Sequence, residues 1–384
     1  MNRIYLDYAA TTPLDSRVLE IIIPLLKDNF GNPSSVHAYG QQADAVLERA
    51  RRKMAEDLEA SPGEIIFTSC GSESDNLALR GTAFAARQDR GADHLLISPI
   101  EHPAVLHTAE QLERWYGFEL EFLPVDRFGM VHPEAVRERL RPRTALVSVM
   151  YAQNEIGTLN PITEIGEICR QAGVVCHTDA VQAGAHLVLD MEQLPVDLLS
   201  LGAHKFYGPK GVGLLYRRKG TPVLAQQTGG SQEFGLRAAT ENVPLIAGMA
   251  EAYHLLQENI PDRASRARSL RDEMISRVLD KIPAVRLTGH PRQRLPNHAS
   301  FAFRDLDGNT LVSLLDSEAI ACSSGSACKT GQPEPSATLE KLGLSSRWTK
   351  GSLRVTVGKD TTADEVGALL EILPRLVAKA RELS

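Results

Sequence analysis

Lys205 is the residue of this chain whose surroundings most clearly indicate chemistry. It follows an apolar stretch, residues 196–201, stands beside His204, and precedes a Gly-Pro-Lys-Gly turn at 208–211. An amine partly removed from water loses its charge and becomes nucleophilic, which is what a Schiff base with an aldehyde cofactor requires. Because most lysines are solvated surface charges, this interpretation depends on finding the other contacts of such a cofactor elsewhere in the chain.

A phosphate site is predicted where a glycine turn opens a helix. Residues 64–68 form a short apolar strand, and Gly71 and Ser72 stand at the start of the following helix. Ligands of open parallel sheets bind at the carboxyl ends of the strands, and the free N–H groups and dipole of a helix N-terminus can hold a phosphate. The same turn could also serve only as a helix cap.

Other strand ends carry side chains that could hold a heteroaromatic ring. Taken singly, each has an ordinary explanation, because a histidine there is more often structural or exposed and a carboxylate can be a helix cap. Together they suit pyridoxal phosphate: an acid for the ring nitrogen, amides for the phenolic oxygen, and an imidazole that stacks on the ring. These residues are His102, Asn154, Asp179 and Gln182.

Two residues near the C-terminus could act on a substrate. Cys328 lies in a run of small residues from Ser323, which is either a plain surface linker or a mobile loop whose thiol reaches a bound substrate; the adjacent Lys329 favours the reactive thiolate. Arg354 stands among apolar neighbours in the strand-like stretch 352–356. It could bind a substrate carboxylate through two parallel hydrogen bonds, or it could lie on the exposed face of its strand.

Alternating strands and helices must position these residues. Repeated alternation from residue 64 to 216 predicts a mainly parallel sheet covered on both faces. A polar loop follows at 226–242, and then a long helix from Pro244 to about Ile282 leads into a smaller unit of strands and helices. We place the domain boundary inside that helix: the expected large domain is 13–258, and the small domain is 1–12 with 259–384.

Composition and motifs exclude several classes of protein. The chain of 384 residues has a formal charge of -6, whereas nucleic acid or an anionic membrane would require a basic face. No nucleotide-binding glycine motif is present. Met1 to Pro13 contains no apolar core long enough for a signal peptide, and no stretch could span a bilayer, so we expect a cytoplasmic protein.

The cysteines predict neither a disulfide framework nor a metal site. They are five in number, which is odd, and none forms a Cys-x-x-Cys pair. We therefore expect free thiols, most of them buried. Their positions are 70, 169, 176, 322 and 328.

The motifs jointly resemble those of the cysteine desulfurases of the IscS and NifS type, in the class V aminotransferase group of fold-type-I pyridoxal phosphate enzymes. The resemblance covers essentially the whole chain and implies a large domain with a mainly parallel seven-stranded sheet and a smaller α+β domain. The motifs are Tyr5-Leu-Asp-Tyr-Ala-Ala-Thr-Thr12, Gly31-Asn-Pro-Ser-Ser35 with His37, Glu101-His102, Asn154-Glu-Ile-Gly157, Asp179-Ala-Val-Gln182, Ala203-His-Lys205, Arg237 with Thr240, and Ser323-Ser-Gly-Ser-Ala-Cys328.

The resemblance also implies an activity and partners. A member of this family is a homodimer that converts L-cysteine to L-alanine and passes the sulfur, held as an enzyme persulfide, to an iron-sulfur scaffold or another acceptor protein. Cys328 would attack the substrate sulfur, and Arg354 would bind the substrate carboxylate together with Asn154. Lys205 would hold the cofactor and shuttle protons, while His102 would stack on the ring and assist acid-base steps.

The remaining residue roles that the resemblance implies concern the cofactor. Asp179 would hold the pyridine nitrogen, and Gln182 and Asn154 would address the ring oxygen. The phosphate would be held by Gly71, Ser72, Gly202 and His204, joined by Thr240 from the partner subunit. Family members commonly have a serine where Gly202 stands, so one hydroxyl donor to the phosphate is missing here.

Two other functions stay open at this point. One is a selenocysteine lyase or a related lyase of the same group, which a comparison of sulfide with selenide release would distinguish. The other is a scaffold that binds sulfur-transfer partners without catalysis, suggested only by the missing serine at Gly202.

Overall fold

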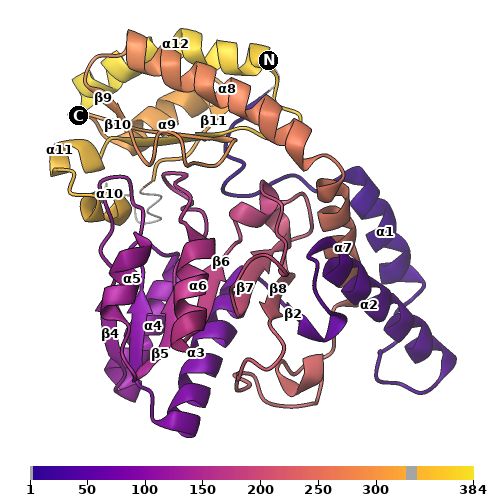
Figure 1. Cartoon of the computed structure of the whole chain (residues 1–384). Coiled ribbons are helices and arrows are strands. Elements are labelled where there is room, and N and C mark those ends of the chain that lie inside the picture. The colour runs from indigo at the N-terminus through magenta and orange to yellow at the C-terminus, as the bar shows by residue number, and fades with distance from the viewer. Residues whose placement is uncertain (1–2, 326–334) are drawn as a thin grey trace.

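The computed structural model describes residues 3–325 and 335–384, and its larger unit is built on one seven-stranded sheet (Figure 1). The strand order is β2-β8-β7-β6-β5-β3-β4. All neighbours are parallel except those of β8, which runs antiparallel to both β2 and β7. The mainly parallel seven-stranded sheet is therefore confirmed. Its strands are β2 (Ile65–Thr68), β3 (His94–Ile97), β4 (Glu119–Phe122), β5 (Thr144–Ser148), β6 (Val175–Asp179), β7 (Leu198–Gly202) and β8 (Gly213–Arg217).

Helices cover both faces of this sheet because successive strand residues point to opposite sides. Leu214 belongs to the core on one face and Leu215 to the core on the other. The first core is completed by the helices α1 (Ser16–Lys27), α2 (Ala38–Asp57), α5 (Pro133–Arg139), α6 (Ile162–Ala172) and α7 (Val243–Gln257). The second is completed by α3 (Gly71–Arg90) and α4 (Pro103–Tyr116).

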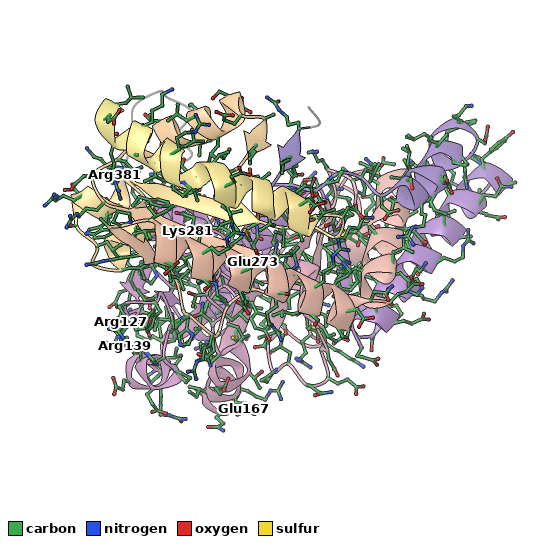
Figure 2. All side chains as sticks on the ribbon, turned by 90° about the horizontal axis from the view of Figure 1, so that it is seen from above. Arg127, Arg139, Glu167, Glu273, Lys281 and Arg381 are labelled. Atoms are coloured by element: carbon green, nitrogen blue, oxygen red, sulfur yellow. The ribbon has the colours of Figure 1, made fainter. Side chains whose placement is uncertain are left out.

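The smaller unit is an antiparallel sheet of order β12-β10-β9 with helices packed on it. Seen from above, α8 and α12 lie side by side, with Glu273 and Lys281 on α8 and Arg381 on α12 (Figure 2). Its elements are α8 (Ile260–Lys281), β9 (Val285–Leu287), β10 (His298–Phe303), α9 (Gly308–Ser317), β11 (Ile320–Ala321), α10 (Ala337–Lys341), α11 (Ser346–Thr349), β12 (Ser352–Thr356) and α12 (Ala363–Leu383).

The prediction of one continuous helix over 244–282 is wrong, because two helices, α7 and α8, are separated by Glu258 and Asn259. Asn259 has φ -140° and ψ 22°, outside the helical region. Pro261 supplies the physical reason. Proline has no N–H to donate, and its ring clashes with the carbonyl four residues earlier, so a helix cannot continue unchanged through it, whereas the first turn of a new helix accommodates it.

The beginning of the chain belongs with the smaller unit. Strand β1 (Ile4–Tyr5) pairs in parallel with β11, and Leu6 is buried in the core of that unit. We propose the division expected from the sequence, 13–258 against 1–12 with 259–384, and the helix break near residue 259 supports it. Within the described ranges, no helix combines the length and the apolar character needed to cross a membrane.

Four of the cysteines can be compared with the expectation. Cys169, Cys176 and Cys322 are buried, Cys70 is half-buried, and all four are free thiols, as predicted. Cys328 lies outside the described residues.

A buried ion pair anchors the segment predicted as a polar loop at 226–242. The Arg51 guanidinium donates to both carboxylate oxygens of Glu233 at 2.8 and 2.9 Å, and the Phe67 N–H donates to the same carboxylate at 2.8 Å. Glu233 and Phe234 adopt left-handed φ angles of 46° and 59°. Such angles are unfavourable for residues with a Cβ, so the ion pair and the strand together hold a strained turn in place.

Helix α12 offers a direct stability test at its capping box. Thr362 Oγ1 accepts the Glu365 N–H at 3.2 Å, and the Glu365 carboxylate accepts the Thr362 N–H at 2.8 Å. Thr362→Ala should lower the free energy of unfolding by about 1 kcal/mol, because a helix N–H loses its acceptor. Urea unfolding checks this, with Lys379→Ala on the exposed side of α12 as control. Equal midpoints for the two variants would show that the cap is dispensable.

Candidate active site

Lys205 lies just beyond the carboxyl end of β7, at the end of a short 3-10 helix that begins at Ala203. Its Nζ donates to the carbonyl oxygens of Ala9 and Ala10, both at 2.7 Å. Burial, with the nearby positive charge of Arg354, lowers the pKa of Lys205 to about 8. A fraction of about a tenth of the amine is therefore neutral at pH 7, which gives the partly desolvated nucleophile that the sequence predicts.

The N-terminal segment closes over this amine. Besides Lys205, the Ala9 carbonyl accepts the Gln182 side-chain amide at 2.9 Å. The Thr12 N–H donates to the His204 carbonyl at 3.0 Å, and Thr11 Oγ1 lies 3.1 Å from His204 Nδ1. The segment thus contacts three predicted site residues, Lys205, Gln182 and His204. Its own sequence is a motif of the resemblance, but no role was predicted for it.

Asp179 and His102 lie near the amine, at the end of β6 and at the N-cap of α4. Asp179 ends β6, is buried, and accepts the Val181 N–H at 2.9 Å. Burial raises the pKa of Asp179, and the His102 and Lys205 side chains oppose this rise. His102 caps α4 by accepting the Ala104 N–H on Nδ1 at 3.1 Å, and burial lowers the pKa of His102, so its ring is neutral.

Two further buried carboxyl groups lie near Asp179: Asp75, which the sequence pattern did not single out, and Glu101, which it placed only in the Glu101-His102 motif without a role. Burial, with the negative charge of Asp179, raises the pKa of both Asp75 and Glu101. One oxygen of each, Asp75 Oδ1 and Glu101 Oε2, has no hydrogen-bond partner within the described chain. The side chains of His102 and Lys205 oppose the rise in pKa only at Asp179, so Asp179 is the most favoured of the three to carry a negative charge. Asp75 stands one helical turn after Gly71 on the buried face of α3, a spacing that could have indicated its burial.

Glycines bring the start of α3 against the end of β7. A Cβ on Gly71 would lie 2.8 Å from the Val181 side chain, whereas a Cβ on Gly202 would lie 3.6 Å from the Gly71 nitrogen and 3.8 Å from the His204 ring. The Cys70 side chain makes no capping hydrogen bond to α3, and burial lowers the pKa of His204 to about 4. Gly71, Gly202 and His204 therefore surround a helix N-terminus suited to an anion, with the exposed Ser72 beside it.

Arg354 is fixed between parts of the chain that are far apart in the sequence. Nη1 donates to the Asn154 carbonyl at 3.0 Å, and Nη2 pairs with the Asp7 carboxylate at 2.8 Å. Its Nε has no partner in the described residues. The alternative of an exposed arginine is excluded, since only 7% of the residue is accessible. The backbone of Ser323 pairs with that of Arg354, so Ser323, where the small-residue run begins, lies beside β12.

Two predicted residues are not brought into this cluster. Cys328 lies outside the described residues. Thr240 is exposed, on the segment whose Arg237 pairs with Glu73 of α3 at 2.9 Å. No hydrogen bond joins Thr240 to the other site residues within the described chain, which is consistent with its expected role toward a second subunit.

The desolvation of Lys205 predicts a pH dependence of stability in the cofactor-free protein. Its folded pKa of about 8 lies below the ordinary value of 10.5, so between these values the unfolded chain binds more protons and stability rises with pH, by at most about 1.4 kcal/mol per pH unit. Relative to Lys205→Met, the wild type should therefore gain stability from pH 8 to 10.5 in urea titrations. A parallel course of the two curves would contradict the assignment.

Comparison with known proteins places these features in a family. The model for the family "Aminotransferase class-V" matches residues 4–369. A protein named cysteine desulfurase IscS from Methanosarcina thermophila is 45% identical over 381 residues, 99% of this chain and 93% of its own. One of the same name from Dictyoglomus turgidum is 44% identical, covering 100% of this chain and 96% of its own.

Solved structures agree with the sequence comparison. A structure described as a NifS-like protein superposes with a TM-score of 0.91 at 36% identity, covering 98% of this chain and 100% of the other. The seven-stranded sheet, the position of Lys205 after β7 and the full-length matches lead to one conclusion: the chain belongs to the class-V aminotransferase family, among its relatives of the IscS and NifS type.

Proposed function

We propose that this chain is a pyridoxal-phosphate-dependent cysteine desulfurase that converts L-cysteine to L-alanine and holds the sulfur as a persulfide on Cys328. Full-length similarity to proteins named cysteine desulfurase supports the activity. The observation that carries the proposal is the desolvated amine of Lys205 near the buried carboxyl group of Asp179 and the guanidinium of Arg354. This arrangement provides a nucleophile, an acid for a ring nitrogen and a binding group for a carboxylate at one sheet edge.

The residues present fit pyridoxal phosphate. The glycines at 71 and 202 leave the N-terminus of α3 accessible for a phosphate, and Asp179 is a buried acid able to keep a ring nitrogen protonated. Gln182 and Asn154 would address the ring oxygen, and the neutral ring of His102 would stack on the cofactor. When bound, this cofactor supplies an electron sink that makes the bonds around the substrate α-carbon labile.

Lys205 would move protons at its Nζ. A pKa of about 8 lets the amine accept and release a proton near neutral pH. The carbonyl oxygens of Ala9 and Ala10 orient the amine, since both accept hydrogen bonds from it. His102, with its lowered pKa, can serve as a second proton acceptor.

Arg354 would orient the substrate through its carboxylate. The Asp7 carboxylate and the Asn154 carbonyl each occupy one side of the guanidinium, which keeps its plane fixed while further N–H groups stay available. A fixed guanidinium gives a carboxylate one orientation, so the substrate sulfur is presented in one direction.

Cys328 would receive the sulfur. Its thiolate attacks the sulfur of L-cysteine, the carbon-sulfur bond breaks, and the electron pair of that bond becomes a carbon-hydrogen bond when a proton is supplied. L-Cysteine and the Cys328 thiol thus give L-alanine and a Cys328 persulfide, and no external oxidant is needed. The persulfide would then pass its outer sulfur to an iron-sulfur scaffold or another acceptor protein.

The proposed assembly is a homodimer in the cytoplasm. The exposed Thr240 would reach the phosphate of the second subunit, because within one chain it makes no hydrogen bond to the described site residues. The dimer, the location and the acceptor proteins remain predictions from the sequence resemblance.

Cysteine-dependent sulfide release and visible absorbance of the purified protein test the mechanism. Wild type should be coloured and active, and Lys205→Ala should lose both properties. Lys210→Ala, which removes an exposed lysine five residues away, should keep both and is the matched control. Cys328→Ala should stay coloured but release sulfide at least about 100-fold more slowly, because the nucleophile is gone. A colourless wild type, or activity that survives Cys328→Ala, would refute the proposal.

Gly202→Ser tests the phosphate site. The Cβ contacts of 3.6 to 3.8 Å are ordinary, so the serine should fit, and its hydroxyl would add a donor beside the Gly71 N–H. The variant should lose the cofactor on dialysis several-fold more slowly than wild type. Gly71→Ala, whose Cβ would lie 2.8 Å from the Val181 side chain, should lose it faster. Unchanged loss rates in both variants would place the phosphate elsewhere.

A further inference from the structure

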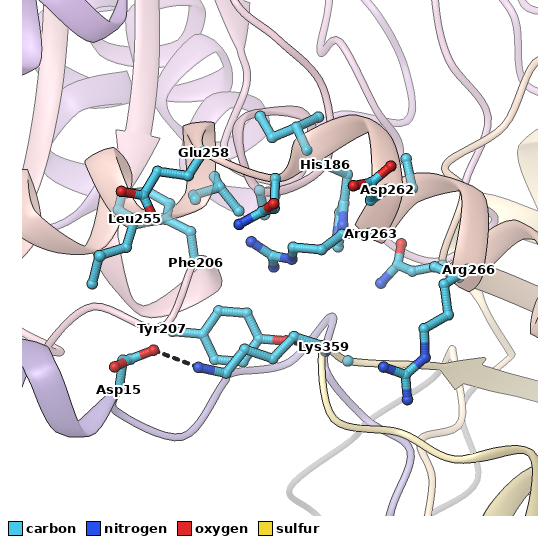
Figure 3. Close-up of a pocket in the computed structure, with 18 of the residues that line it drawn as sticks. Asp15, His186, Phe206, Tyr207, Leu255, Glu258, Asp262, Arg263, Arg266 and Lys359 are labelled. Carbon is cyan, nitrogen blue, oxygen red and sulfur yellow. Dashed lines mark hydrogen bonds and ion pairs between the residues drawn. The ribbon is translucent and has the colours of Figure 1, made fainter.

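A cavity lies at the junction of the two units. Its volume is about 380 Å³, and it opens where α7 ends and α8 begins, next to the N-terminal segment and the turn after β12 (Figure 3). The side chains of Lys205, His102, Asp179 and Arg354 do not line it. It is therefore separate from the candidate active site, and its size is in the range of small-molecule sites.

Arg263 is the central polar group of this cavity. Figure 3 shows its guanidinium reaching into the space between His186 and Tyr207. Burial lowers the pKa of Arg263, and the guanidinium carbon lies 5.3 Å from the centre of the Tyr207 ring. Within residues 3–325 and 335–384, no carboxylate forms an ion pair with it. The carboxylates of Asp360 and Asp15 act on Arg263 without forming an ion pair with it, and a partly desolvated cation with no carboxylate in contact favours an anionic ligand.

The other charged groups leave this preference intact. Asp15 is neutralised by ion pairs with Arg17, at 3.0 Å, and with Lys359 (Figure 3). Asp262 and Glu258 are exposed, so water screens their charges. The N-terminus of α8, which begins at Ile260 without a side-chain cap, adds partial positive charge on the same side.

His186 and an apolar wall complete the lining. Burial, with the charge of Arg263, lowers the pKa of His186 to about 3, so the imidazole is neutral. No hydrogen bond of its ring occurs in the described chain. The apolar part of the lining consists of the half-buried Leu255, Ala264 and Ala267, backed by the fully buried Phe206 and Leu256.

We propose that this cavity, which we call the hinge cavity, binds a small amphiphilic carboxylate: an anionic head group on Arg263 and an apolar tail against Leu255 and Ala264. A guanidinium and a carboxylate match in planar, bidentate geometry. The apolar wall favours a hydrocarbon tail over a free inorganic anion. The inference is independent of the reaction at Lys205.

The position of the hinge cavity links its occupant to the active site. Tyr207 follows Lys205 by two residues, and its hydroxyl oxygen accepts the Lys359 N–H at 2.7 Å. Val357, another lining residue, directly follows the strand that carries Arg354. An occupant would therefore contact both units where they join, which is where an effector, rather than a substrate, would bind.

Calorimetric titration of the purified full-length protein with octanoate tests the proposal. Wild type should bind with a dissociation constant of about 1 mM or lower. Arg263→Met keeps the stem and removes the charge, so it should bind at least about tenfold more weakly. Arg268→Met, an exposed arginine on the same helix, is the matched control and should bind as wild type does. Octanol and inorganic phosphate should each bind more weakly than octanoate.

A second variant covers the case in which Arg263→Met does not fold. Ala264→Leu fills part of the cavity while leaving Arg263 in place, so it should also abolish octanoate binding. Binding of octanoate that is equal in wild type and Ala264→Leu would show that it sits elsewhere. The proposal would be overturned if wild type gave no heat of binding with octanoate up to about 10 mM, or if it bound octanol as tightly as octanoate.

Discussion

The structure depends on the removal of one amine from water. The Nζ of Lys205 exchanges solvent for the carbonyl oxygens of Ala9 and Ala10, at 2.7 Å each. These oxygens belong to a segment that starts as a strand of the smaller unit, where β1 pairs with β11, and that ties down Arg354 through Asp7. The position and the proton affinity of the amine are therefore set by both units together, because the larger unit carries the lysine and residues 1–12 of the smaller unit carry its acceptors.

A second constraint is the number of negative charges that the sheet edge can hold. Asp75, Glu101 and Asp179 are all buried, and like charges in a medium of low dielectric cannot all ionise. Burial and the charge of Asp179 raise the pKa values of Asp75 and Glu101 well above the usual range, whereas His102 and Lys205 oppose the rise at Asp179. Of the three, Asp179 is therefore the most favoured to carry the negative charge, and its burial strengthens any ion pair that it forms.

The alternation of strands and helices, and the residues at the strand ends, could be predicted because both follow from local patterns. Asp179 and Lys205 come after apolar runs that form adjacent strands, so the sheet brings them together. The break at Asn259 was missed because the apolar periodicity continues through it, although Pro261 forbids a continuous helix. The pairing of Asp7 with Arg354, 347 residues apart, and the raised pKa of Asp75 arise from packing between distant segments, which no local pattern encodes. The roles of Thr240 and Cys328 stay predictions from the resemblance.

The ion pair of Arg51 and Glu233 restricts how this sequence can change. Removing either partner would leave the other charged and buried, since each side chain is at most 4% accessible, at a cost of several kcal/mol. Replacing both by apolar residues would still leave the Phe67 N–H without its acceptor. It would also remove the contacts that hold a turn with two left-handed residues in place. The two positions are therefore expected to vary together or stay fixed, and a sequence that had lost only one of them would have to reroute the whole 226–242 connection.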